Sequence, residues 1–289
     1  MSKNMRYRFL RFPGGKPKAV TFSYDDGVKQ DIRLSELMTK HGLKCTFNLN
    51  SEALKQGSGL SKDEVENKLL ACGHEIAVHG YFHRGEGSVR PIEGIRDVLD
   101  MRLELERKYN RIIRGMAYPD SGITFFANGA NYETIKNYLK ELDIAYARTL
   151  GGDNALFQLP QDFYAWMPTA HHNNPKVLEY VDAFLALDVV SDGVYASGRS
   201  SRLFYLWGHS YEFDRDDNWE LIETICEKFS GKDDIWCATN MEIYEYITAY
   251  NALIYSADGN MVYNPTLTEV WFDVDGTLYV VKPGETITI

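Results

Sequence analysis

The sequence predicts an α/β protein with about seven parallel strands covered by helices, followed by a small antiparallel β appendage. Short apolar, β-rich runs alternate with helix-period segments from residue 18 to about residue 250. These runs are almost continuously apolar, which is typical of strands covered on both faces. After Ala252 the chain changes to short alternating segments broken by Asp-Gly and Pro-Gly pairs, which favour hairpins. We therefore expect a lead-in (1–17), a β/α domain (18–250) and a β extension (251–289). The sheet is either a barrel or an open doubly wound sheet.

The predicted strands are the apolar runs Lys18–Ser23, Lys44–Asn50, His74–Val78, Ile112–Ala117, Ile144–Arg148, Leu203–Gly208 and Ile235–Thr239. Apolar residues spaced three and four apart predict helices between them, at Ile92/Ile95/Leu99/Leu103, Val177/Val181/Phe184 and Ile222/Ile225/Phe229. Ser61 to Glu64 has the pattern of a capping box, which predicts a helix start. Asn174 followed by Pro175 predicts another.

Composition excludes several classes of protein. The 289 residues include 44% hydrophobic side chains, enough to build a core, so disorder is excluded as the main state. The net charge of −10 argues against nucleic acid or an anionic membrane as the main partner. No run of 18 uncharged apolar residues occurs, and the basic start lacks a signal-peptide core, so we expect a cytoplasmic protein. The four cysteines form no C-x-x-C pair and are expected to be reduced and buried.

Polar side chains follow three of the predicted strands, where the sites of parallel α/β proteins lie. Asp25 and Asp26 follow the first strand, His79 and His83 the third, and His209 the sixth. Singly, each has an ordinary explanation: a solvated turn for the aspartates, a hydrogen-bonded side chain for each histidine. Together they predict a catalytic metal site, because one aspartate and two histidines leave an open position for water. The other aspartate and histidine are then available as base and acid.

The same residues resemble the motifs of the polysaccharide deacetylases with the NodB-homology domain, carbohydrate esterase family four. The segment from Thr21 to Gly27 resembles the first family motif, T-F-D-D-G, with two extra residues before the aspartates. The segment from Gly73 to His83 is similar to the second, G-H-E-I-x-x-H-[ST]-x-x-H, with glycine in place of Ser or Thr. Leu206 to His209 resembles the last, L-x-x-H. The resemblance spans roughly residues 18 to 250.

This resemblance implies a fold, a site and a reaction. The fold would be a distorted (β/α) barrel. Asp26, His79 and His83 would bind a divalent metal, Asp25 would be the general base and His209 the general acid. Two nitrogen ligands and one oxygen ligand suit zinc, and cobalt, nickel or iron fit the same shell. The implied reaction is removal of an acetyl group by water activated at the metal.

Two further motifs depart from the family pattern. The third, R-x-P-[YFW], has alanine at position 117 where the arginine that orients the base is expected. Arg148, at the end of the next strand, can reach the same place, with a surface ion pair as the competing interpretation; Arg114 lies inside its strand. The fourth, D-x-x-D-W, is echoed from Asp162 to Trp166 without its second acid, which suggests a substrate other than a chitin-like chain.

Several side chains near the strand ends are candidate substrate contacts. They are Tyr118, Asp120, Trp166, His172 and Trp207. The aromatic residues can stack on a sugar ring or pack in the core, and His172 can order its loop instead. The leading hypothesis is a metal-dependent deacetylase of a carbohydrate or glycoconjugate. The alternatives are a metal-dependent C–N hydrolase of a small cyclic amide and a catalytically silent glycan-binding module. Nothing in the sequence indicates the oligomeric state.

Overall fold

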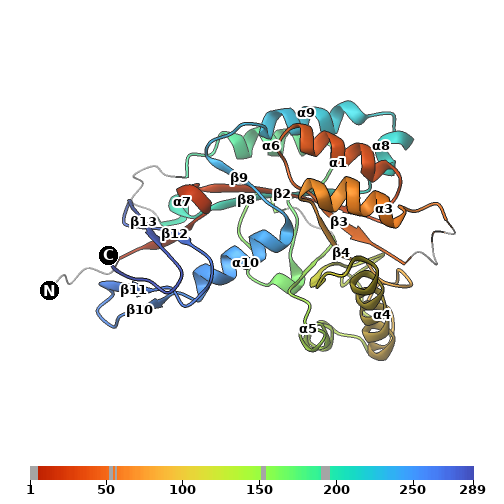
Figure 1. The fold of residues 1–289 in the computed structure, drawn as a ribbon, viewed down its shortest axis with the longest axis horizontal. Helices are drawn as coiled ribbons and strands as arrows, with labels where there is room; N and C mark the ends of the chain where they lie inside the picture. Colours follow the sequence, from red (N-terminus) through yellow and green to blue (C-terminus); the bar gives the residue numbers. More distant parts are fainter. Residues whose placement is uncertain (1–5, 52–54, 56, 151–153, 190–195) are drawn as a thin grey trace.

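The computed structural model describes residues 6–51, 55, 57–150, 154–189 and 196–289. Its centre is a curled parallel sheet in the order β6-β5-β4-β3-β2-β8-β7, with β9 also paired to β2 (Figure 1). Its strands are β2 (Lys18–Asp25), β3 (Thr46–Leu49), β4 (Glu75–Val78), β5 (Gly115–Ala117), β6 (Tyr146–Arg148), β7 (Ala170–His171), β8 (Arg202–Gly208) and β9 (Ile235–Cys237). All seven predicted strands are present, and the distorted parallel barrel is confirmed.

Strand β2 is the axis of the sheet, and all eight of its residues are buried. β8 pairs along it from Lys18 to Tyr24, while β9 and β3 share its other side. The two ends of the sheet approach each other through the segment 166–171. Trp166 exchanges backbone hydrogen bonds with β6, and β7 pairs with β8. β7 was not predicted, because two residues are too few to show a period.

Helices cover both faces of the sheet. They are α1 (Gln30–Lys40), α3 (Lys62–Glu64), α4 (Pro91–Tyr109), α5 (Tyr132–Glu141), α6 (Val177–Leu185), α7 (Ala196–Arg199), α8 (Tyr211–Arg215), α9 (Trp219–Phe229) and α10 (Asn240–Asn251). In Figure 1, α1, α6 and α9 lie on one side of β2 and β8, and α10 lies on the other. The Ser61 capping box is present and starts α3. No helix in the described ranges has both the length and the apolar character to cross a bilayer.

Two helix predictions need correction. The predicted apolar stripe of α4 is not the buried one, since Ile92 is 56% and Leu99 36% exposed. The helix buries Val98, Met101 and Leu105 instead, a neighbouring stripe with the same period. α6 begins at Val177 rather than directly after Asn174, whose side chain accepts a hydrogen bond from the Lys176 amide.

The C-terminal segment forms two three-stranded antiparallel sheets, as the turn signals predict. One joins β1 (Arg8–Arg11), β12 (Val270–Val274) and β13 (Thr277–Val281), and the other β10 (Ile254–Tyr255), β11 (Met261–Tyr263) and β14 (Thr286–Thr288). The Asp275-Gly276 turn has φ angles of 49° and 91°, which suits a hairpin turn of the primed type. Because β1 pairs with β12, part of the lead-in belongs to the same sheet as the C-terminal strands (Figure 1).

The four cysteines are free thiols. Cys45 and Cys226 are buried, as expected, and burial raises the pKa of both thiols. Cys72 is exposed and Cys237 is only partly buried, which corrects the expectation that all four are buried. Cys72 lies in the short turn Leu70–Cys72 before β4, none of whose residues is buried.

Candidate metal centre and active site

The two adjacent aspartates at the end of β2 have different surroundings. Asp25 is 1% exposed and closes the strand, whereas the Asp26 side chain is 21% exposed. Asp26 has φ of 81° and Gly27 φ of 64°, so the chain turns sharply after the strand. A positive φ is uncommon for a residue with a Cβ, although aspartate tolerates it better than most, and such strain occurs at functional sites. Asn50 donates a hydrogen bond of 2.9 Å to Asp26 Oδ1.

The three predicted metal ligands converge. Oδ1 of Asp26 lies 3.7 Å from Nε2 of His79 and 3.4 Å from Nε2 of His83. One ligand atom from each of the three residues lies within 4.8 Å of the others. A cation with bonds of about 2.0–2.2 Å to nitrogen and oxygen ligands requires this order of spacing between them. The His83 side chain is 33% exposed, so this side of the site is open to solvent.

The surroundings of His79 fit a metal ligand. Its Nδ1 lies 3.0 Å from the Ala117 carbonyl oxygen, which only accepts hydrogen bonds. The ring proton therefore lies on Nδ1, and the Nε2 lone pair faces Asp26 and His83. Metal-bound histidines characteristically donate their second nitrogen in this way. Burial lowers the pKa of His79, which favours the neutral ring that a metal requires.

Asp25 is held by a buried arginine. Nη2 of Arg148 donates a 2.6 Å hydrogen bond to Asp25 Oδ2, and Asn48 donates a 2.8 Å bond to Oδ1. Arg148 is completely buried, with its guanidinium 4.1 Å from the centroid of the Trp207 ring. Arg148 therefore lies where it can orient Asp25, which was one of its two predicted roles. The alternative, a surface ion pair, does not apply because the side chain is buried. Arg114 is partly exposed and pairs with Asp143, away from this cluster.

Asp25 ionises readily despite its burial. Burial by itself raises the pKa of the carboxyl, but Arg148, His79 and His209 outweigh it and leave the pKa below its ordinary value. Asp25 is therefore ionised at neutral pH. Its Oδ2 lies 3.7 Å from Nε2 of His79 and 4.0 Å from Nε2 of His209, between the candidate ligands and the predicted acid.

Glu212, which was not predicted, lies beside His209. Glu212 lies in α8, and its Oε2 is 3.4 Å from Nδ1 of His209. Burial by itself lowers the pKa of His209, but Glu212 and Asp25 outweigh it and raise the pKa. The signal was present in the sequence, since a glutamate three residues after a histidine shares its side of a helical turn. Asp162, by contrast, accepts a hydrogen bond from Tyr132 and pairs with Lys136 rather than with His209.

The candidate substrate contacts divide into two groups. Tyr118, Trp166 and His172 are at most 1% exposed, so they present no surface to a substrate and act in the core. We therefore no longer expect these three residues to contact substrate. Trp207 is half-buried and Asp120 is exposed, with φ of 49°. These two remain candidates for substrate contact.

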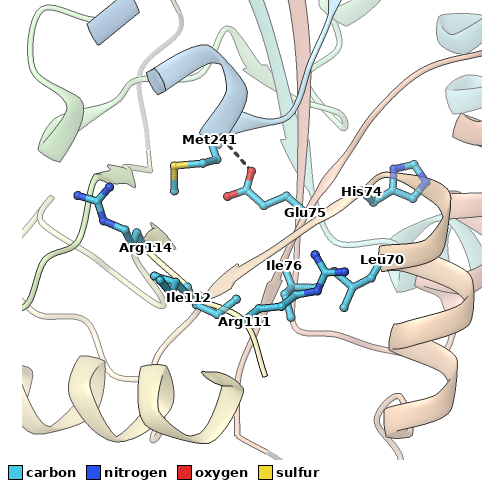
Figure 2. A pocket seen from close by; sticks show the side chains of 9 residues that line it. Leu70, His74, Glu75, Ile76, Arg111, Ile112, Arg114 and Met241 are labelled. Atoms are coloured by element: carbon cyan, nitrogen blue, oxygen red, sulfur yellow. Dashed lines mark hydrogen bonds between the residues drawn. The ribbon is translucent and has the colours of Figure 1, made fainter. Parts of the chain in front are cut away.

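A cavity of about 380 Å³ lies at the opposite end of the sheet, near the starts of β4 and β5 (Figure 2). Glu75 points into it and accepts hydrogen bonds from Tyr146, Thr46 and the Met241 amide. None of the predicted catalytic residues lines this cavity. In parallel barrels this end serves stability, so we assign the Glu75 network to the fold.

Glu86, three residues after His83, gives a testable prediction on stability. It is 1% exposed, and neither carboxylate oxygen has a hydrogen-bond partner outside the Glu86 backbone in the described part of the chain. Burial, with a smaller contribution from Asp97, raises the pKa of Glu86 well above its usual value. A raised acid pKa means that stability is greatest below the unfolded value of about 4.3 and falls as the pH rises.

Glu86→Gln should therefore raise the free energy of unfolding by about 2 kcal/mol at pH 7, because the amide needs no proton to become neutral. The gain should vanish below about pH 4, where the wild-type side chain is protonated in both states. Urea unfolding at both pH values measures the difference. Glu141→Gln, at an exposed position of α5, is the control and should change little. An equal gain for Glu86→Gln at both pH values would show that Glu86 is ionised in the folded protein.

The curled parallel sheet, with its carboxylates and imidazoles gathered at the strand ends, is typical of a barrel hydrolase. Residues 12–147 match the family model described as polysaccharide deacetylase. The family predicted from the motifs is thus confirmed over residues 12–147, which match the polysaccharide deacetylases, a hydrolytic family. A search of curated proteins finds no match.

Solved structures show the same fold. A putative polysaccharide deacetylase from Mycobacterium smegmatis is 17% identical, with a TM-score of 0.58 over 86% of this chain and 96% of the other. Puue allantoinase is 14% identical, with a TM-score of 0.56 over 81% of this chain and 91% of the other. At these identities the similarity establishes the fold.

Proposed function

We propose that this protein is a divalent-metal-dependent hydrolase that removes acetyl groups from a carbohydrate or glycoconjugate. The observation that carries the proposal is the convergence of Asp26, His79 and His83 beside a separate, ionised carboxylate, Asp25. A structural metal site has no need of a free carboxylate at its edge, whereas hydrolysis needs a base there.

The metal, when bound to Asp26, His79 and His83, supplies a water of lowered pKa and polarises the carbonyl of the acetyl group. Zinc suits this donor set, and cobalt, nickel or iron are compatible with it. Asp26 provides the oxygen ligand, and each imidazole provides one nitrogen; in His79 the hydrogen bond from Nδ1 to the Ala117 carbonyl leaves the Nε2 lone pair free.

The remaining groups move the protons. Asp25, fixed by Arg148 and Asn48, accepts a proton from the attacking water as the water bonds to the carbonyl carbon. His209, whose Nε2 faces Asp25, donates a proton to the leaving amine or alkoxide as its bond to the carbonyl carbon breaks. Because the pKa of Asp25 is lowered and that of His209 is raised, the base is ionised and the acid is protonated at the same pH.

A second candidate function keeps the same site and changes the bond. A C–N hydrolase of a small cyclic amide needs the same base, acid and metal, and the likeness in fold to an allantoinase favours testing it. A silent glycan-binding module is disfavoured, because binding alone has no use for the buried Asp25–Arg148 pair.

Metal removal tests the proposal. The protein, stripped with a chelator and dialysed, should lose at least 100-fold in turnover of an acetylated-sugar panel, and added zinc or cobalt should restore it. A parallel panel of small cyclic amides separates the two candidate reactions. Undiminished turnover by the stripped protein would rule out the metal-dependent mechanism.

A further inference from the structure

A second cluster of imidazoles surrounds Glu212, beyond the proposed ligands. Its Oε2 lies 3.2 Å from Nε2 of His171, 3.2 Å from Nε2 of His172 and 3.4 Å from Nδ1 of His209. In composition this cluster resembles a metal site, since His171, His209 and Glu212 each offer one ligand atom to a common point.

The hydrogen bonds around His171 argue against a metal there. The Asn173 amide donates a 3.1 Å hydrogen bond to Nδ1 of His171. Nδ1 is therefore the acceptor, and in the neutral ring the proton lies on Nε2, pointing toward Glu212. A metal ligand needs the opposite arrangement, the one His79 has through its bond to Ala117. The cluster is therefore three imidazoles within ion-pair distance of one carboxylate oxygen, which accepts no hydrogen bond in the described part of the chain.

The fold fixes Glu212 from several sides. Arg215 lies 3.4 Å from its other oxygen, Oε1. His172, which is completely buried, stacks between Phe213 at 4.3 Å and Tyr24 at 5.7 Å. A Cβ at Gly208 would lie 2.0 Å from Nδ1 of His172, so the ring needs glycine at this position of β8. These contacts hold the carboxylate beside His209, whose other ring nitrogen faces Asp25.

We propose that Glu212 is the positioning residue for His209: it holds the Nδ1 proton and so directs Nε2–H toward the leaving group beside Asp25. The inference rests on the proposed function for its catalytic meaning. During turnover His209 gives up its Nε2 proton as the bond to the leaving group breaks, keeps its Nδ1 proton at Glu212 and becomes neutral. At 3.4 Å the two atoms are not in hydrogen-bond geometry, and both are buried without another hydrogen-bond partner among the described residues. Such catalytic contacts often tighten when substrate binds.

NMR of isotope-labelled histidine tests the tautomer without any substrate. In the wild-type protein, His209 should keep its Nδ1 proton across its whole titration, and in Glu212→Gln it should titrate at lower pH. The charged and titratable groups around His209 are Asp25, Asp26, His171, His172, Glu212 and Tyr211. Glu220→Gln, on the next helix and outside this group, is the matched control. A neutral wild-type His209 protonated on Nε2 would overturn the inference even if the variant failed to fold.

Turnover and metal content complete the test. Glu212→Gln should lower kcat about 10- to 100-fold with little change in KM, and its alkaline limb should move to lower pH. It should retain the metal content of the wild-type protein. A second equivalent of zinc in the wild-type protein that disappears in Glu212→Gln would instead make the cluster a metal site. The NMR and metal readouts stand even if no acetylated substrate is turned over, so failure of the proposed function is separable from failure of this inference.

Discussion

Asp25→Asn should lower kcat about 1,000-fold while the protein keeps its metal. The amide cannot accept a proton from water, and positioned general bases contribute about 10²–10⁴ in rate. The amide has the same shape, and its oxygen can still accept from Arg148; its NH2 can donate to Asn48 once that side-chain amide turns its unpartnered Oδ1 toward position 25. Metal binding should persist, because the proposed ligands are Asp26, His79 and His83 rather than Asp25. Measuring turnover of the best substrate in the panel checks the loss of rate, and measuring the metal content checks that the metal is retained.

A matched control for this variant comes from Asp143→Asn. Asp143 pairs with Arg114 on the surface, so the same chemical change there should leave turnover intact. A wild-type rate in Asp25→Asn would remove the base from the mechanism. Loss of metal together with activity would make Asp25 a ligand.

Arg148→Met should reduce the free energy of unfolding by about 3–5 kcal/mol in the metal-free protein, because it leaves the Asp25 carboxylate buried without its counter-charge. The pKa of Asp25 is lowered in the folded state, so the stabilisation is present above the usual aspartate value of about 3.9 and is lost as the pH falls through the folded value. The difference between wild type and variant should therefore shrink in acid. Denaturant unfolding at pH 7 and near pH 3 measures it.

Arg114→Met is the natural comparison, since it removes the other arginine that was considered for this role. Its pair with Asp143 is partly exposed, and the expected change is within about 0.5 kcal/mol. Equal effects of the two substitutions would mean that burial of the Asp25–Arg148 pair does not matter, contrary to the account of the site.

Much of the fold could be predicted, because its strands are apolar runs of ordinary length with helical periods between them. The convergence of Asp26, His79 and His83 followed from topology, since the ends of neighbouring parallel strands meet at one edge of a sheet. Arg148 could be placed in the same way, because it ends β6, the neighbour of β5, where the family pattern has its arginine.

Other features depend on packing that sequence patterns do not record. The buried stripe of α4 and the predicted one have the same period, and the packing of α4 against β4 and α5 decides between them. Trp166 lies at a strand end, yet its contacts with Tyr146 and Tyr205 bury it. Glu212 was not predicted because it lies in α8, beyond the strand end where catalytic residues of parallel sheets are expected.

The central claim is that one divalent cation binds Asp26, His79 and His83, and anomalous X-ray scattering from crystals grown with zinc or cobalt tests it most directly. The account predicts a single strong peak bonded to the Asp26 carboxylate and to Nε2 of both histidines, and none between His171 and Glu212. A peak confined to the second cluster, or no peak at saturating metal, would contradict it.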